Sequence, residues 1–181
     1  MNKKEGLEAA VLDGNVHAVH QLIVQGADVR HTDLHGRTFL VLAAQNGYLE
    51  VALLLLESGA DVGHADRLGK TALMYAAGDG ETELVLLLLE RGANVDTTDI
   101  WREPALIFAV AHGHTEVSLL LLTAGANPNC ANACEESALL LAAEGGHVET
   151  ARLLLDKGAN VNYATGYGNT ALMGAAGEFT T

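Results

Sequence analysis

The sequence predicts an all-α fold, a solenoid of stacked helix-turn-helix units joined by β-hairpin-like turns. The main observation is an internal repeat, because the pair Gly-Ala recurs every 33 residues, at 26–27, 59–60, 92–93, 125–126 and 158–159. Such a fixed period is typical of repeat architectures. Further columns keep the same period: Gly14, Gly47, Gly80, Gly113 and Gly146; Asp33, Asp66 and Asp99; Glu50, Glu83, Glu116 and Glu149. A second observation is that the apolar stretches are too short for helices that stand alone.

Residues 66–98 show how one unit is built. Asp66 to Gly69 is expected to form a tight turn, with glycine at the position of positive φ. Thr71 is a good N-cap for a first helix with the sequence ALMYAA, which ends at Gly80. A second helix, ELVLLLLE, is apolar on nearly all sides, which is typical of a helix enclosed by its neighbours. We expect such short helices to be stable only when the units stack on one another.

The units are expected to form one domain that spans the whole chain of 181 residues. The N-terminal unit is predicted to be a cap with a polar first helix, and the last is a truncated unit or C-terminal tail. The predicted boundaries are 1–32 for the cap, 33–65, 66–98, 99–131 and 132–164 for the second to fifth units, and 165–181 for the last.

Composition narrows the function classes. Hydrophobic residues make up 49% of the chain but aromatic residues only 4%, so the core must be built from Leu, Ala and Val. A formal net charge of −13 with only 10 Lys and Arg argues against nucleic acid, which requires a clustered basic surface. The apolar runs are far shorter than the ~20 residues of a membrane span, and the N-terminus lacks a signal-peptide pattern. Two cysteines indicate a reduced intracellular protein, cytoplasmic or nuclear.

The units resemble those of the ankyrin-repeat family, in which a β-turn and two helices carry a T-P-L-H-x-A signature. The corresponding segments are TFLVLA at 38–43, TALMYA at 71–76, PALIFA at 104–109, SALLLA at 137–142 and TALMGA at 170–175. Second helices begin with GYLEV at 47–51, GHTEV at 113–117 and GHVET at 146–150. His114 and His147 in these segments are expected to form hydrogen bonds at the helix start. The signature proline and histidine are absent at their usual places, but the period and the glycines remain.

Catalytic and metal-binding patterns are not found in the sequence. G-x-x-x-x-G-K-[ST], G-x-S-x-G and H-E-x-x-H are all absent. The periodic glutamates are interpreted as complements to the dipoles of the second helices. His31 and His64 occupy equivalent positions but lack further zinc ligands, and Cys130 and Cys134 are expected to be ordinary thiols. We therefore expect no enzyme, no cofactor and no metal.

The resemblance implies that a partner contacts the turn tips and the exposed side of the first helices, along a concave surface. At these positions we expect the partner-binding residues Leu34, Arg37, Arg67, Leu68, Lys70, Ile100, Trp101, Glu103, His112, Glu136 and Tyr167. The basic residues lie in the second and third units, and the acidic residues in the fourth and fifth. Opposed charges of this kind would orient a partner more than they tighten its binding. The alternative is a random scatter of solvated charges.

The fourth tip departs from the others. Arg102 replaces the turn glycine, which costs about 1 kcal/mol if the left-handed geometry is kept. Pro104 replaces the capping threonine, and because proline favours the first helical position, the helix is expected to start differently. We interpret Trp101 as an exposed anchor for a partner, with Ile100 and Leu68 as further apolar contacts. The alternative is that the altered turn folds Trp101 down as packing.

These observations favour a non-catalytic module that binds a partner protein or peptide through its tips and groove. A monomer is expected, without nucleic acid or membrane partners. The alternative is a structural or assembly role, in which the open C-terminal end self-associates or stacks on further repeats. The residues expected on that open face are Ala171, Leu172, Ala175 and Ala176.

Overall fold

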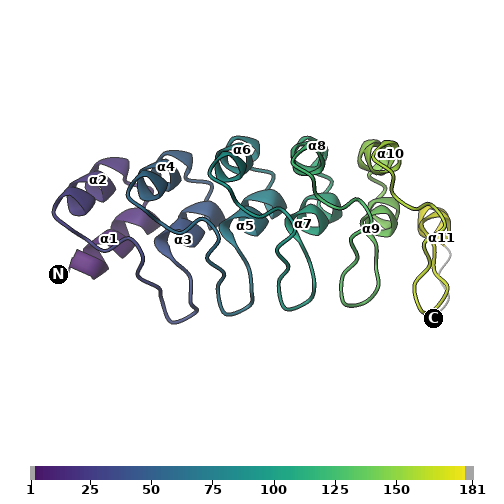
Figure 1. Cartoon of the computed structure of the whole chain (residues 1–181), viewed down its shortest axis with the longest axis horizontal. Coiled ribbons are helices and arrows are strands. Elements are labelled where there is room, and N and C mark those ends of the chain that lie inside the picture. Colours follow the sequence, from purple (N-terminus) through teal and green to yellow (C-terminus); the bar gives the residue numbers. More distant parts are fainter. Residues whose placement is uncertain (1–2, 178–181) are drawn as a thin grey trace.

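The structure, a computed structural model, describes residues 3–177. Within this range eleven α helices form two rows, and hairpin turns project from one side of the inner row (Figure 1). The inner row consists of α1 (Lys3–Leu12), α3 (Phe39–Gln45), α5 (Ala72–Gly78), α7 (Ala105–Ala111), α9 (Ala138–Glu144) and α11 (Ala171–Ala176). The outer row consists of α2 (Val16–Val24), α4 (Leu49–Glu57), α6 (Thr82–Glu90), α8 (Thr115–Thr123) and α10 (Val148–Asp156). The predicted all-α solenoid is confirmed. Residues 1–2 of the predicted cap and 178–181 of the predicted last unit lie outside the described residues.

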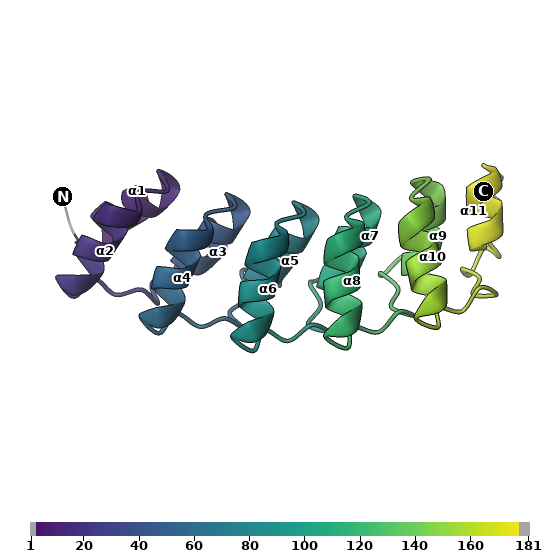
Figure 2. The same ribbon diagram turned by 90° about the horizontal axis from the view of Figure 1, so that it is seen from above.

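Packing runs from each unit to the next. Each inner helix contacts the following inner helix, and each outer helix except α10 contacts the following outer helix (Figure 2). The core between the rows is aliphatic, and the fully buried side chains include Leu40, Leu55, Leu73, Leu88, Leu106 and Leu121. Burying one such side chain contributes roughly 1.5–3 kcal/mol. Helices of seven to nine residues are therefore stabilised by burial between units.

Inner helices begin at the predicted caps. Side chains of Thr38, Thr71, Ser137 and Thr170 accept hydrogen bonds from the backbone amides three residues on. Pro104 corrects one expectation, because the helix after it does not start differently. Pro104 lies at the N-cap with φ −77° and ψ 169°, close to the −96° and 165° of Thr71, and α7 begins at Ala105 in the common register. An N-cap has extended backbone geometry, which the proline ring permits.

Outer helices are less enclosed than predicted. Leu86 of α6 and Leu119 of α8 are 45% and 44% exposed. The opposite face of α6 packs inward through Leu84, Val85 and Leu88, which are buried. An outer helix has an inner helix beneath it and neighbours on two sides, but no element covers its outer face among the described residues. Apolar composition alone therefore overestimated the burial of these helices.

The hairpins are held by a repeated acceptor at the first turn position. Asp66 Oδ1 accepts hydrogen bonds from the backbone amides of Leu68 and Lys70, at 2.8 and 3.0 Å. Asp33, Asp99 and Asn132 make the same pair of bonds in their own tips, and we call these four residues the tip column. Short antiparallel bridges, such as that between Ala65 and Thr71, close the base of each hairpin.

Neighbouring tips are also joined to one another. The backbone amides of Arg67, Ile100 and Ala133 donate to the carbonyl oxygens of His35, Leu68 and Trp101 in the preceding tips, at 3.0, 3.0 and 2.7 Å. These bonds connect the second tip to the fifth without interruption. The tips consequently form a continuous edge in which the position of each tip depends on its neighbours.

His114 and His147 do not make the expected bonds at the start of their own helices. His114 Nε2 lies 3.0 Å from the carbonyl oxygen of Gly78, and His147 Nε2 lies 3.3 Å from that of Ala111. Both acceptors belong to the end of the preceding inner helix. The two histidines therefore link consecutive units, which the GHxE pattern alone did not reveal.

Arg102 keeps the left-handed geometry of the glycine it replaces. Its φ is +63°, compared with +78° for the equivalent Gly36 and Gly69. Glu135, at the same position in the fifth tip, also has a φ of +63°, which was not predicted. A side chain in this region is strained because Cβ approaches the following carbonyl oxygen.

Replacing Arg102 by glycine is expected to raise the free energy of unfolding by about 0.5–1 kcal/mol in urea denaturation. The change relieves strain of roughly 1–2 kcal/mol, partly offset by the greater freedom of glycine in the unfolded chain. Arg91 provides the control, because it is exposed with an ordinary φ of −88°, and Arg91→Gly should destabilise. Equal losses of stability in both variants would contradict the strain at Arg102.

Candidate functional site

The groove face is the surface formed by the hairpin tips and the exposed side of the inner helices. Hollows open along it, including one of about 430 Å³ that is lined by His35, Arg37, Asp66, Arg67, Leu68 and Tyr75. Large apolar side chains remain exposed at the tips, namely Leu34, Leu68, Ile100, Trp101 and Tyr167. Trp101 is 45% exposed, so the fourth turn does not fold it into the core.

An aromatic cluster surrounds the ammonium group of Lys70. The Nζ atom lies 4.4 Å from the ring centre of Phe108, 5.5 Å from that of Trp101 and 5.9 Å from that of Tyr75. Cations are attracted to the faces of aromatic rings at these distances. Tyr75 and Phe108 were missed by sequence reasoning, although their half-burial follows from a shared position in α5 and α7. Leucine occupies that position in α3 and α9.

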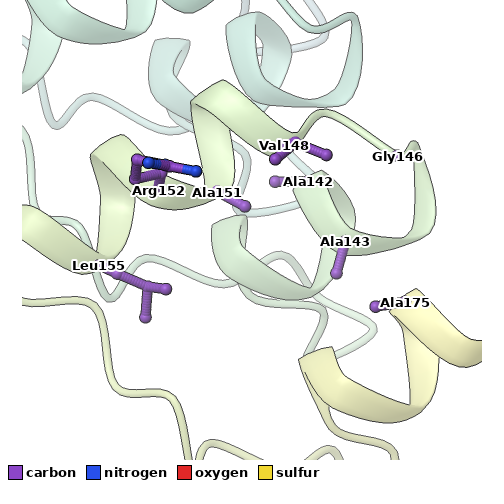
Figure 3. A pocket seen from close by; sticks show the side chains of 8 residues that line it. All are labelled: Ala142, Ala143, Gly146, Val148, Ala151, Arg152, Leu155 and Ala175. Carbon is purple, nitrogen blue, oxygen red and sulfur yellow. The ribbon is translucent and has the colours of Figure 1, made fainter.

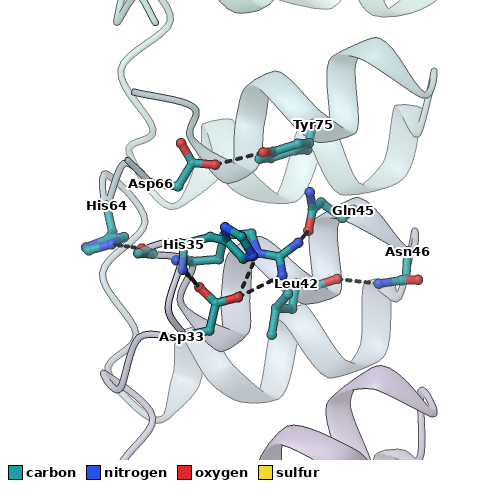
Figure 4. A network of polar contacts seen from close by, with 10 residues as sticks. Asp33, His35, Leu42, Gln45, Asn46, His64, Asp66 and Tyr75 are labelled. Atoms are coloured by element: carbon teal, nitrogen blue, oxygen red, sulfur yellow. Dashed lines mark hydrogen bonds and ion pairs between the residues drawn. The ribbon is translucent and has the colours of Figure 1, made fainter. Parts of the chain in front are cut away.

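Arg37 is occupied within its own unit. Its guanidinium forms an ion pair of 2.7 Å with Asp33 Oδ2, and Nη1 donates to Gln45 Oε1 at 3.0 Å. Burial alone would raise the pKa of Asp33, but hydrogen bonds from Arg37 and from the His35 amide hold that pKa below its ordinary value. Figure 4 shows this network beside the next unit. The geometry gives Arg37 a structural task in addition to any contact with a partner.

Tyr75 takes the corresponding role in the third unit. Its hydroxyl donates to Asp66 Oδ2 at 2.7 Å (Figure 4). Burial, followed by the bond to Asp66 and the charge of that carboxylate, raises the pKa of Tyr75 to about 12. The second oxygen of the tip carboxylate is therefore satisfied by an inner-helix side chain here, and by arginine in the unit before.

The fourth unit leaves the equivalent oxygen without a donor. Asp99 is 6% exposed, and its Oδ1 accepts from the amides of Trp101 and Glu103 at 2.9 Å each. Its Oδ2 is buried and has no hydrogen-bond partner among the described residues. The reason is a pair of changes, because Glu103 stands where the second unit has Arg37, and Phe108 stands where the third unit has Tyr75. Neither replacement carries a donor.

The fifth unit resolves the same position with an amide. Asn132 Nδ2 donates to Glu136 Oε2 at 2.8 Å and lies 3.4 Å from Glu103 Oε1. Burial raises the pKa of Glu103, the bond from Asn132 opposes that rise, and the charges of Asp99 and Glu136 add to it. Burial and the charge of Glu136 likewise raise the pKa of Glu144. The acidic side chains of the groove face thus lie close enough to destabilise one another's ionised forms.

The structure brings some predicted residues together and keeps others apart. Lys70 and His112 line one hollow of about 210 Å³ with Tyr75 and Phe108, and Trp101 borders Lys70 from the tip. The remaining predicted residues are distributed along the array, from Leu34 and Arg67 near one end to Glu136 and Tyr167 toward the other (Figure 1).

Reactive groups offer little chemistry in the described part of the chain. Cys130 and Cys134 are free thiols, and burial, with a smaller contribution from the charge of Asp96, raises the pKa of Cys130 to about 12. A thiol with such a pKa is a poor nucleophile at neutral pH. Within residues 3–177 no group of three or more His, Cys, Asp or Glu side chains is placed to hold a metal ion. In the same range no helix has the length and apolar character that crossing a membrane requires.

Comparison with known proteins identifies related sequences. A family model described as ankyrin repeats, in three copies, matches residues 7–99 and 105–179. A curated ankyrin repeat protein of Rickettsia felis is 41% identical over 51 residues, which cover 28% of this chain and 78% of that protein. The resemblance seen in the sequence is confirmed.

Asp99→Asn is expected to raise the free energy of unfolding by about 1 kcal/mol, because a buried acceptor without a donor is removed. The variant should fold normally, since Asn132 supports an equivalent tip. Phe108→Tyr should also stabilise, by providing the hydroxyl that Tyr75 provides to Asp66. Tyr75→Phe is the matched opposite and should cost roughly 1–3 kcal/mol by leaving Asp66 in the state of Asp99. Urea denaturation of the three variants measures these changes, and destabilisation by Asp99→Asn would contradict the assignment.

Proposed function

The chain belongs to the ankyrin-repeat family, and we propose that it is a non-catalytic module whose groove face binds a partner protein or peptide. Ankyrin repeats generally act in protein–protein interaction and are generally not enzymes. The extended surface of a solenoid suits contact with a folded protein or an extended segment. The low reactivity of the Cys130 thiol is consistent with a binding role.

The observation that carries the proposal is the exposed aromatic and apolar surface of the third and fourth units. Trp101 and Ile100 are 45% and 59% exposed on tips that backbone bonds fix in place. Tryptophan is enriched among the residues that dominate binding energy, and a rigid support lowers the entropy lost on association. Leu68 and the ring of Phe108 extend this surface toward the inner helices. We therefore assign the apolar anchors of the partner to this region.

Charged residues on either side are proposed to orient the partner. Arg67 is exposed and Lys70 half-buried at the third tip, whereas Glu103 and Glu136 lie half-buried in the fourth and fifth units. Complementary charges of this kind influence encounter and alignment more than affinity. The remaining candidates, Leu34, Arg37, His112 and Tyr167, extend the proposed contact along the array. A cytoplasmic or nuclear location, and the absence of any cofactor, stay predictions.

The test compares capture of proteins from a cytosolic lysate by the wild type and by Trp101→Ser, read by mass spectrometry. A partner retained by the wild type and lost with Trp101→Ser is expected. Leu86→Ser is the control, because Leu86 has the same exposed fraction of 45% but lies on the outer row. Capture that is unchanged by Trp101→Ser, or equally reduced by both variants, would contradict the assignment of the contact to the fourth tip.

A second candidate function is self-association through the C-terminal end of the array. A hollow of about 430 Å³ lies between α9, α10 and α11, where Ala142, Ala143, Gly146, Val148, Ala151, Arg152, Leu155 and Ala175 line it (Figure 3). Leu155 is 44% exposed, and Leu172 on α11 is 78% exposed. Apolar surface of this kind is typical of interaction sites, so stacking of a second copy is the specific alternative.

Sedimentation velocity over a range of concentrations separates the two functions. The binding module is expected to keep the mass of one chain, 18.9 kDa, at every concentration. Self-association predicts a mass that rises with concentration and returns to that of one chain in Leu155→Glu, since a charge in the hollow opposes stacking. Exposed Leu86, far from the hollow, supplies the control variant Leu86→Glu. A dimer unaffected by Leu155→Glu would contradict the C-terminal interface.

A further inference from the structure

The tip column presents the same chemical problem four times and solves it within the chain three times. Each tip residue uses one oxygen to bind two backbone amides, and its second polar atom needs a partner of its own. Arg37 supplies that partner to Asp33, Tyr75 supplies it to Asp66, and Asn132 instead donates to Glu136. Asp99 has no such partner among the described residues, although it is more than nine-tenths buried.

We propose that an arginine side chain of the partner binds the fourth unit, where its guanidinium takes beside Asp99 the place that Arg37 takes beside Asp33. This assignment rests on the proposed function, because it names the chemistry recognised by the same groove face. The second unit is the internal template. There a guanidinium bonds the carboxylate at 2.7–2.8 Å and a neighbouring amide oxygen at 3.0 Å.

The register of the units places the required groups around one point. Glu103 and Phe108 occupy the positions of Arg37 and Tyr75, the two side chains that reach the second tip oxygen in earlier units. An arriving guanidinium would therefore meet the carboxylate of Glu103 first, with Asp99 behind it. Two carboxylates suit the planar, multiply donating guanidinium better than the compact ammonium of lysine.

The aromatic cluster supports the same ligand. Guanidinium groups stack on aromatic faces, and Trp101 and Phe108 already hold the ammonium of Lys70 at 5.5 and 4.4 Å. The rings therefore favour positive charge at this place. Because Asp99 Oδ2 is buried, the half-exposed side chains of Trp101 and Lys70 have to shift as the guanidinium enters. Such rotamer changes at an interface are common on binding.

Charge favours a basic ligand as well. Glu103 and Asp99 lie within each other's field, and Glu136 adds a third negative charge nearby. Lys70 is the basic residue whose charge acts on Glu103 in the opposite direction. A partner arginine would bring a second positive charge to a region where carboxylates outnumber it. The net charge of −13 draws such a partner toward the chain at long range.

The experiment uses the fluorescence of Trp101, which is the one tryptophan of the chain and therefore reports on this site alone. The probe is the peptide acetyl-Gly-Arg-Gly-amide, titrated beside the same peptide with citrulline, which is neutral and nearly isosteric, and with lysine. Saturable binding of the arginine peptide is expected, at least about tenfold tighter than that of the citrulline peptide, since charged hydrogen bonds are lost. The lysine peptide should bind more weakly than the arginine peptide.

Two variants test the role of Asp99 without loss of the fold. Asp99→Asn removes the charge but keeps the turn bonds, as Asn132 does, and Phe108→Tyr supplies a donor from within the chain. Both should weaken the arginine peptide about tenfold, whereas Glu83→Gln on the exposed face of α6 should leave it unchanged. Denaturation curves of all variants verify that they are folded.

Several outcomes would overturn the assignment of arginine. These are a response that does not saturate, equal binding of the arginine and citrulline peptides, lysine binding as tightly as arginine, and variants of Asp99 and Phe108 that bind like the wild type. Any of these results, combined with a partner whose capture depends on Trp101, would leave the proposed function in place and remove only the arginine.

Discussion

Burial of leucine and alanine side chains between neighbouring units is the interaction on which the rest of the structure depends. Each inner helix has only six or seven residues after the first unit, too few to persist alone in water. Stacking supplies the stabilisation, and it also sets the spacing of the tips. Backbone hydrogen bonds from tip to tip then join the hairpins into one edge, so exposed residues such as Trp101 are carried on a positioned framework.

The tip column links this framework to recognition. One acceptor repeated at every tip secures the turns, and its second polar atom is free to be satisfied in different ways. Arginine, tyrosine and an asparagine–glutamate pair are used in three tips. At Asp99 the missing donor costs stability, because a buried polar group without a partner loses its hydration without compensation. Local cost of this kind is tolerated where the site serves another purpose.

The charge pattern of the groove face changes meaning once the contacts are known. Arg37 is largely committed to Asp33, and the ammonium of Lys70 lies over aromatic rings. The positive charge offered to a partner by the second and third units is consequently smaller than the residue types indicate. The carboxylates of the fourth and fifth units, by contrast, raise one another's pKa. The balance favours a partner with a basic group at the fourth unit.

Sequence alone determined the features that depend on local chemistry repeated at a fixed spacing. The 33-residue period, the caps at Thr38 and Thr71, and the exposed position of Trp101 at a tip could all be predicted, because each follows from a residue's place within one unit. Only the tertiary structure decided which side chains of different units meet. The cluster of Tyr75, Trp101 and Phe108 around Lys70, and the buried oxygen of Asp99 without a donor, arise from side chains that approach across the stack. Their distances depend on packing and rotamers, which the periodic pattern does not specify.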